Sequence, residues 1–313
     1  MDGRNIIWSV EFLAHGTYIV SGGLEGKVRR WRAEDGREVG TEMNAGGQVF
    51  DLAGSQDGKW VVSGTHNGLV KVWNAESHEK VSEIHGHAKP VGAVDISPDA
   101  TRIATGSDDS TACVWSLASG ERLLGPLQHD GRLAAVRHSP NGDFIATATC
   151  SHESVRVYKS LDGSLIADFQ VRVGSYLNQS LAWSLDSKQL YALTKYGNIH
   201  CVDVATGTTR SKWSIQDGDK PRCISLAANG TFIAASVNSS VTFWDSTTHK
   251  QIGVALQYDD TISSMLISPN NEHLVSGGDD KKISLQDLRG ILPESYFIRV
   301  STSTERLLPR TIR

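Results

Sequence analysis

The chain has 313 residues, of which 39% are hydrophobic and 21% are charged, and its formal net charge at pH 7 is −4. This composition is typical of a soluble globular protein, and the slight negative charge argues against broad electrostatic capture of nucleic acid or of an anionic membrane. The apolar runs are far shorter than the roughly 20 residues needed to cross a bilayer, and no apolar leader follows Met1. We therefore expect a soluble cytoplasmic protein with no nucleic-acid or membrane partner.

Short alternating apolar runs, separated by Gly, Asn, Asp and Pro, recur along the whole chain, and no long segment keeps a helical period. The most regular unit has four such runs, which lie at residues 91–99, 102–109, 111–115 and 122–127. Tight-turn residues join them. Each run predicts a strand, so the unit predicts a sheet of four antiparallel strands.

The same unit returns seven times, with an aromatic residue at one fixed point in five of the copies. These aromatic anchors are Trp31, Trp73, Trp115, Tyr158 and Trp244, and Val202 and Gln286 occupy the remaining two places. Successive anchors lie 42 to 44 residues apart. Four strands in a period of about 40 to 45 residues indicate a propeller blade, because one blade cannot bury both faces of its sheet without neighbours.

The sequence thus predicts an all-β protein that forms a single seven-bladed β-propeller with four antiparallel strands per blade, over residues 1–302. The predicted blades span residues 5–43, 48–85, 90–128, 132–171, 176–215, 221–257 and 261–302. Residues 303–313 are expected to form a flexible C-terminal tail.

Each unit closes on a dipeptide at the anchor, intact as Trp-Asp only at residues 244–245 and varied elsewhere. With seven registered copies, the array resembles the WD-repeat (WD40) family of β-propellers, and its turns are similar to those of repeat arrays in fungal and bacterial signalling proteins. The resemblance implies a non-catalytic scaffold or sensing module that binds a protein or peptide. A small ligand or carbohydrate bound near the central channel is the alternative, and a propeller enzyme is the least favoured.

A histidine, a serine and an aspartate accompany the anchor of the third unit, a composition that also occurs in catalytic triads. In WD-repeat proteins residues of these types form a structural tetrad, which the resemblance places at His87, Ser107, Asp109 and Trp115. A buried indole N–H needs a hydrogen-bond partner. We therefore expect these four residues to stabilise the blade and to have no catalytic role.

The resemblance also implies that a partner binds the top face, at the start of each innermost strand and beside the turn aspartates. The candidate partner-binding residues are Trp8, Phe50, His66, Asp108, Arg132, Lys195, Lys220, Arg222 and Asp279. They suggest an aromatic sector over blades one and two and a basic sector over blades four to six, which suits a partner with an acidic stretch. The alternative for Trp8 and Phe50 is that they plug the channel.

No motif indicates a cofactor or a metal. Cys113, Cys150, Cys201 and Cys223 stand singly on different predicted strands, as small buried residues do, and the His85–His87 pair is explained by a strand end and the tetrad.

The sequence also suggests how the ring closes. The few residues before the first strand are too short to supply an outer strand to blade seven, so residues 291–300 are expected to form that strand and the seam between blades one and seven to open first. We expect a monomer.

Overall fold

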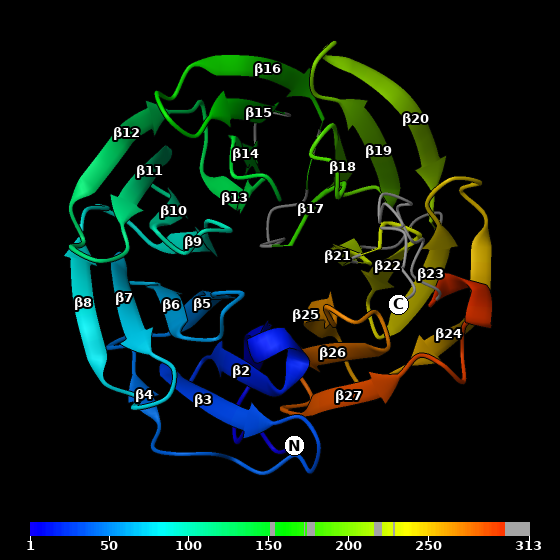
Figure 1. Cartoon of the computed structure of the whole chain (residues 1–313), viewed down its shortest axis with the longest axis horizontal. Coiled ribbons are helices and arrows are strands. Elements are labelled where there is room, and N and C mark those ends of the chain that lie inside the picture. Colours follow the sequence, from blue (N-terminus) through cyan, green and yellow to red (C-terminus); the bar gives the residue numbers. More distant parts are fainter. Residues whose placement is uncertain (151–153, 172, 174–178, 216–220, 228, 298–313) are drawn as a thin grey trace, which may run out of the picture.

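The computed structural model describes residues 1–150, 154–171, 173, 179–215, 221–227 and 229–297, and it is a ring of seven sheets around a central axis (Figure 1). The predicted seven-bladed β-propeller is confirmed. Six sheets have four antiparallel strands, and the seventh has three. The only helices in these ranges are the 3₁₀ turns η1 (Ala14–Gly16) and η2 (Glu294–Tyr296), and none is long and apolar enough to cross a membrane.

The strands follow the chain from the central axis outwards in every blade. Blade one contains β1 (Ile7–Leu13), β2 (Tyr18–Gly23), β3 (Lys27–Arg32) and β4 (Met43–Asn44). Blade two contains β5 (Val49–Gly54), β6 (Trp60–Thr65), β7 (Leu69–Asn74) and β8 (Lys80–His85). Blade three contains β9 (Val91–Ile96), β10 (Arg102–Ser107), β11 (Thr111–Ser116) and β12 (Arg122–Gln128). Blade four contains β13 (Leu133–His138), β14 (Phe144–Thr149), β15 (Ser154–Lys159) and β16 (Leu165–Gln170).

The remaining blades keep this order. Blade five contains β17 (Leu181–Trp183), β18 (Gln189–Leu193), β19 (Asn198–Asp203) and β20 (Thr208–Ser214). Blade six contains β21 (Pro221–Leu226), β22 (Phe232–Val237), β23 (Ser240–Asp245) and β24 (Gln251–Gln257). Blade seven contains β25 (Ile262–Ile267), β26 (His273–Gly278) and β27 (Ile283–Asp287).

The hydrophobic core lies between neighbouring blades, because the two inner strands of each sheet carry apolar side chains on both faces. One cluster packs Val62 and Val72 of blade two against Val94, Ile103 and Cys113 of blade three, all buried. Equivalent clusters join the other neighbours. Stability is therefore shared around the ring, as in other repeat architectures.

Polar side chains on or just before the innermost strands satisfy backbone N–H groups that would otherwise lack a partner at the inner edge of each sheet. Ser9 of blade one accepts a hydrogen bond from the N–H of Leu52 in blade two, and Asp51 of blade two accepts one from Val94 in blade three, both at 3.0 Å. Gln179 accepts one from Met265, also at 3.0 Å, and so links blade five to blade seven. Each of these bonds ties one blade to another.

The N-terminal residues pair with the outer edge of blade seven, which corrects the expectation that they could not do so. Asp2 forms an antiparallel bridge with Lys282. The N–H of Ile283 donates to the carbonyl oxygen of Met1 at 2.9 Å, and the N–H of Gly3 donates to that of Lys281 at 2.7 Å. The ring is therefore closed by a short exchange between its ends, and only three residues are needed for it.

The expectation that residues 291–300 form an outer strand is wrong for the described residues 291–297. Residues 294–296 form η2, and this segment packs on blade six, where the Tyr296 hydroxyl donates to Asp245 at 2.8 Å. The Tyr296 ring contacts Phe232 edge-on at 6.1 Å between centroids. Residues 298–300 and the tail expected at 303–313 lie outside the described residues.

The seam offers a first test. We expect Gly3→Val to destabilise the ring, because a Cβ at this position would lie 2.5 Å from Ile7 Cδ1 and 3.0 Å from the Lys281 oxygen. Hydrogen exchange at the Ile283 amide should accelerate at least tenfold, whereas exchange at Val114 in blade three should not change. Equal protection of Ile283 in both proteins would show that this pairing does not hold the seam.

Candidate functional site

A chain of hydrogen bonds links the anchor of blade three to the turn between β10 and β11. The Trp115 indole N–H donates to Thr105 Oγ1 at 2.8 Å, and Thr105 Oγ1 lies 2.7 Å from His87 Nε2. His87 Nδ1 lies 2.9 Å from Asp109 Oδ2. The carboxylate fixes the proton on Nδ1, so Nε2 accepts the threonine hydroxyl. Every polar atom along this chain has a partner.

The hydroxyl in this chain belongs to Thr105, so the assignment of Ser107 to the tetrad is wrong. The Ser107 hydroxyl donates to the carbonyl oxygens of Lys89 and Pro90, at 3.1 and 2.8 Å, and accepts from the N–H of Asp109 at 3.1 Å. Thr105 and Ser107 point to the same face of β10, but two residues of strand, about 7 Å, separate them. Thr105 reaches the indole, whereas Ser107 ties the turn to the preceding loop.

A spacing of ten residues before the anchor could have located the correct hydroxyl. The Trp31 indole donates to Ser21 at 2.9 Å, and the Trp73 indole donates to Ser63 at 3.3 Å. Thr105 stands at the same distance before Trp115. Blades one to three therefore repeat this bond, and among these three blades only blade three adds the histidine and the aspartate. In blade four, His129 Nε2 lies 2.9 Å from Thr147 Oγ1 and 3.3 Å from the hydroxyl of the anchor Tyr158.

Burial separates this group from a catalytic triad. The His87 side chain is 1% exposed and Thr105 is wholly buried, so a substrate has no access to the hydroxyl that faces the imidazole. Burial acts to raise the pKa of Asp109, but hydrogen bonds from Thr111 and His87 outweigh it and hold this pKa below its ordinary value. The carboxylate therefore stays charged and oriented. That His87, Asp109 and Trp115 stabilise the fold remains a prediction.

Trp8 and Phe50 stand at the starts of β1 and β5 on the top face, and both are half-buried. Their rings meet edge to face, with centroids 5.3 Å apart and planes at 69°. His66, the third member of the expected aromatic sector, lies in the turn after β6, is exposed, and donates its backbone N–H to Gln48. The structure therefore brings Trp8 and Phe50 together as one apolar contact surface.

The expected basic sector is only partly described. Arg132 lies 3.9 Å from Asp108 of the neighbouring blade, with both side chains partly exposed, so these two candidates offset each other. Lys195 is exposed and lies over the Tyr196 ring at 4.9 Å from its centroid. Asp279 is half-buried in the turn of blade seven. Lys220 lies outside the described residues, as does the side chain of Arg222.

Sequence reasoning missed a group of charged residues on the innermost strands. Glu11, Asp51 and Asp95 come from blades one to three, and Arg137 of blade four places its Nη1 atom 3.9 Å from Asp51 Oδ2. Burial raises the pKa of Glu11 to about 8 and that of Asp51 to about 6, and Arg137 opposes both shifts. The sequence does contain a sign of this charged group. At the repeat position of Glu11, Asp95 and Arg137, other blades have the uncharged residues Ala53, Ala182 and Leu266.

The described residues also limit the chemistry of the site. Among them, no group of three or more His, Cys, Asp or Glu side chains is arranged to hold a metal ion. Burial raises the pKa of the buried Cys113 and Cys201 thiols, and it raises the pKa of the half-buried Cys150 to about 11. These thiols are therefore protonated and poorly nucleophilic at neutral pH.

Comparison with known families gives matches along the ring. The family model described as WD domain, G-beta repeat, matches residues 2–32, 38–74, 78–116 and 251–287. A second model, described as the anaphase-promoting complex subunit 4 WD40 domain, matches residues 136–229. No curated protein is similar to the chain at a significant level. The matched ranges touch all seven blades.

Proposed function

Because the chain belongs to the WD-repeat family, we propose that it is a non-catalytic scaffold that binds a protein or peptide on the top face of its propeller. Propellers of this family generally act as protein-interaction scaffolds and bind proteins or peptides. We place this chain in the cytoplasm as a monomeric signalling scaffold. The top face is the finer part of the proposal, and the contact between Trp8 and Phe50 supports it.

The aromatic pair supports binding because its two rings are held in place yet remain half-exposed. Trp8 and Phe50 fix each other edge to face, so little side-chain entropy is lost when a partner covers them. Tryptophan and arginine are also enriched among residues that dominate binding energies. Lys195 belongs, with Lys220 and Arg222, to the basic sector expected over blades four to six, and such a sector would favour a partner with an acidic stretch.

Affinity capture from the native extract tests this proposal. We expect Trp8→Ala and Phe50→Ala each to reduce the captured partner at least tenfold, and the Trp8→Ala/Arg222→Ala double variant to reduce it further. Val254→Ala is the matched control, because Val254 is 66% exposed but lies on the outer strand β24.

The melting temperatures of all the variants should stay close to that of the wild type, so that a loss of capture reports a lost contact. Undiminished capture by the double variant would refute the top-face assignment. An equal loss in Val254→Ala would show that the contact is not specific to this face.

A further inference from the structure

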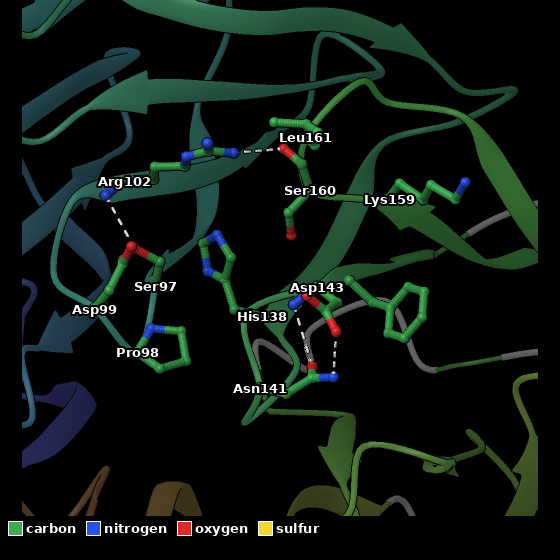
Figure 2. Close-up of a pocket in the computed structure, with 12 residues that line it drawn as sticks. Ser97, Pro98, Asp99, Arg102, His138, Asn141, Asp143, Lys159, Ser160 and Leu161 are labelled. Atoms are coloured by element: carbon green, nitrogen blue, oxygen red, sulfur yellow. Dashed lines mark hydrogen bonds between the residues drawn. The ribbon is translucent and has the colours of Figure 1, made fainter.

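A groove on the bottom face, opposite Trp8 and Phe50, lies between blades three and four and has a volume of about 650 Å³ (Figure 2). The turn after β9 forms one wall with Pro98 and Asp99, and the turn after β13 forms another with Asn141 and Asp143. Residues 159–161, at the end of β15, complete the lining. This volume is in the range of small-molecule sites.

Two buried side-chain atoms in the groove lining have no hydrogen-bond partner. They are Nε2 of His138, whose side chain is 2% exposed, and the hydroxyl oxygen of Ser160, which is 5% exposed as a residue. In Figure 2 the His138 ring lies between the Arg102–Ser160 pair and Asn141. The two atoms do not bond to each other, and a buried polar atom without a partner is costly.

The repeat itself shows that the fold does not need these polar groups. Each innermost strand has one residue in the register position of His138, opposite the second residue of the second strand. In the other six blades these residues are Phe12, Gly54, Ile96, Trp183, Leu226 and Ile267. The residues two places after the anchor, where Ser160 stands, are Ala33, Ala75, Leu117, Val204, Ser246 and Leu288. Only Ser246 is polar among these, and its hydroxyl donates to the Gly230 carbonyl at 2.6 Å.

The geometry around His138 sets which kind of group would bind there. Asp95 Oδ2 lies 2.9 Å from His138 Nδ1 and accepts the His138 backbone N–H at 2.6 Å. The carboxylate therefore holds the imidazole proton on Nδ1, which leaves Nε2 as an acceptor in the neutral ring. A hydroxyl serves both groups, because it can donate to Nε2 and accept from Ser160.

The rest of the lining favours a neutral ligand over an anion. The positive charges of Arg102 and Lys159 are matched by the negative charges of Asp99 and Asp143. Arg102 Nη1 already donates to the Ser160 carbonyl at 2.7 Å, so its charge is directed into the wall. Pro98, Phe144 and Leu161 add apolar surface beside these polar groups. Hydroxyl partners next to an apolar surface suit a sugar ring, which has polar edges and an apolar face.

We propose that this groove is a binding site for a neutral polyhydroxyl ligand the size of one or two sugar rings, with His138 and Ser160 sharing one ligand hydroxyl. The site is separate from the top-face partner surface and does not rest on it. Asp95 acts as a positioning residue, because it fixes the tautomer of His138.

NMR of the full chain labelled with ¹⁵N-histidine, titrated with glucose, mannose, galactose, N-acetylglucosamine and maltose, tests the proposal. We expect at least one of these sugars to bind with a Kd of about 1 mM or lower and to shift the His138 Nε2 resonance. Ser160→Ala and His138→Phe introduce residues that other blades carry at these positions, and each should weaken this sugar at least tenfold. Ser160→Ala should do so without lowering the melting temperature, because the Ser160 hydroxyl has no partner in the protein.

Ser246→Ala is the matched control, because it removes a satisfied hydroxyl at the same repeat position. It should lower the melting temperature and leave sugar binding unchanged. The proposal is overturned if no sugar shifts the His138 resonance, if acetate or inorganic phosphate does so instead, or if sugar binding survives in both Ser160→Ala and His138→Phe. Destabilisation by Ser160→Ala would also overturn it, since the hydroxyl would then serve the fold through an internal water.

Discussion

Thr105→Val is expected to lower the free energy of unfolding by about 2 to 4 kcal/mol, because it leaves two buried polar groups without partners. Valine matches threonine in shape, so the loss comes from hydrogen bonding and not from a cavity. The Trp115 indole N–H and His87 Nε2 both lose the Thr105 hydroxyl, and neither group is accessible to water. Denaturant unfolding followed by tryptophan fluorescence measures the difference.

Three further variants of blade three separate this hydrogen-bonded chain from its surroundings. Asp109→Ala and Trp115→Phe should also lower the melting temperature, and neither should abolish binding of a top-face partner. Ser107→Ala should cost less than Thr105→Val, because it removes contacts to backbone groups near the surface. If Ser107→Ala proves the more destabilising of the two, Ser107 and not Thr105 is the important hydroxyl. Unchanged melting of both Asp109→Ala and Trp115→Phe would defeat the structural role.

Glu11→Gln is expected to raise the melting temperature at alkaline pH and to have little effect near pH 4. Burial raises the pKa of Glu11 to about 8 in the folded protein, against an ordinary value of 4.5. The folded state therefore holds this proton more tightly than the unfolded state, so the contribution of Glu11 to stability is complete below pH 4.5 and is lost as the pH rises through about 8. Glutamine keeps the bond that the Phe12 N–H donates to Glu11 and cannot ionise.

Thermal unfolding from pH 4 to pH 9 measures this effect as the difference between the variant and the wild type. The difference should grow with pH and level off above about pH 8. Glu76→Gln is the control, because Glu76 is exposed on a turn of blade two, and its curve should follow the wild type. A difference for Glu11→Gln that is the same at pH 5 and pH 9 would show that Glu11 titrates as an exposed carboxyl does.

The seven-bladed ring could be predicted from the sequence because the same sequence features recur in most of its blades. Aromatic anchors 42 to 44 residues apart and alternating apolar runs carry the same information in most blades, so the degenerate anchors Val202 and Gln286 do not break the register. The pairing of Met1 and Gly3 with blade seven was missed for a physical reason. It uses only backbone groups, and backbone hydrogen bonds leave no mark on residue choice.

The roles of individual site residues could not be predicted from the sequence pattern, because they depend on side-chain positions that the pattern does not determine. Ser107 and Thr105 are both hydroxyl residues on the same face of one strand, and the position of the Trp115 indole decides between them. The Asp108–Arg132 contact joins two blades, so no local pattern predicts it. Likewise, Glu11 and Arg137 stand 126 positions apart in the sequence, and the curvature of four successive blades brings them near enough to interact.

The bridge between Asp2 and Lys282 also orders the events of folding during synthesis. Residues 1–3 are synthesised before the strands of every blade, yet they pair with the sheet whose strands are made last, so they wait without their partners until β27 has emerged. Six blades can stack along the growing chain through contacts between neighbouring blades. The seventh blade instead joins two segments about 280 residues apart. The entropy cost of bringing these segments together is lower once the six blades between them have folded. Completion of the ring therefore follows the emergence of β27.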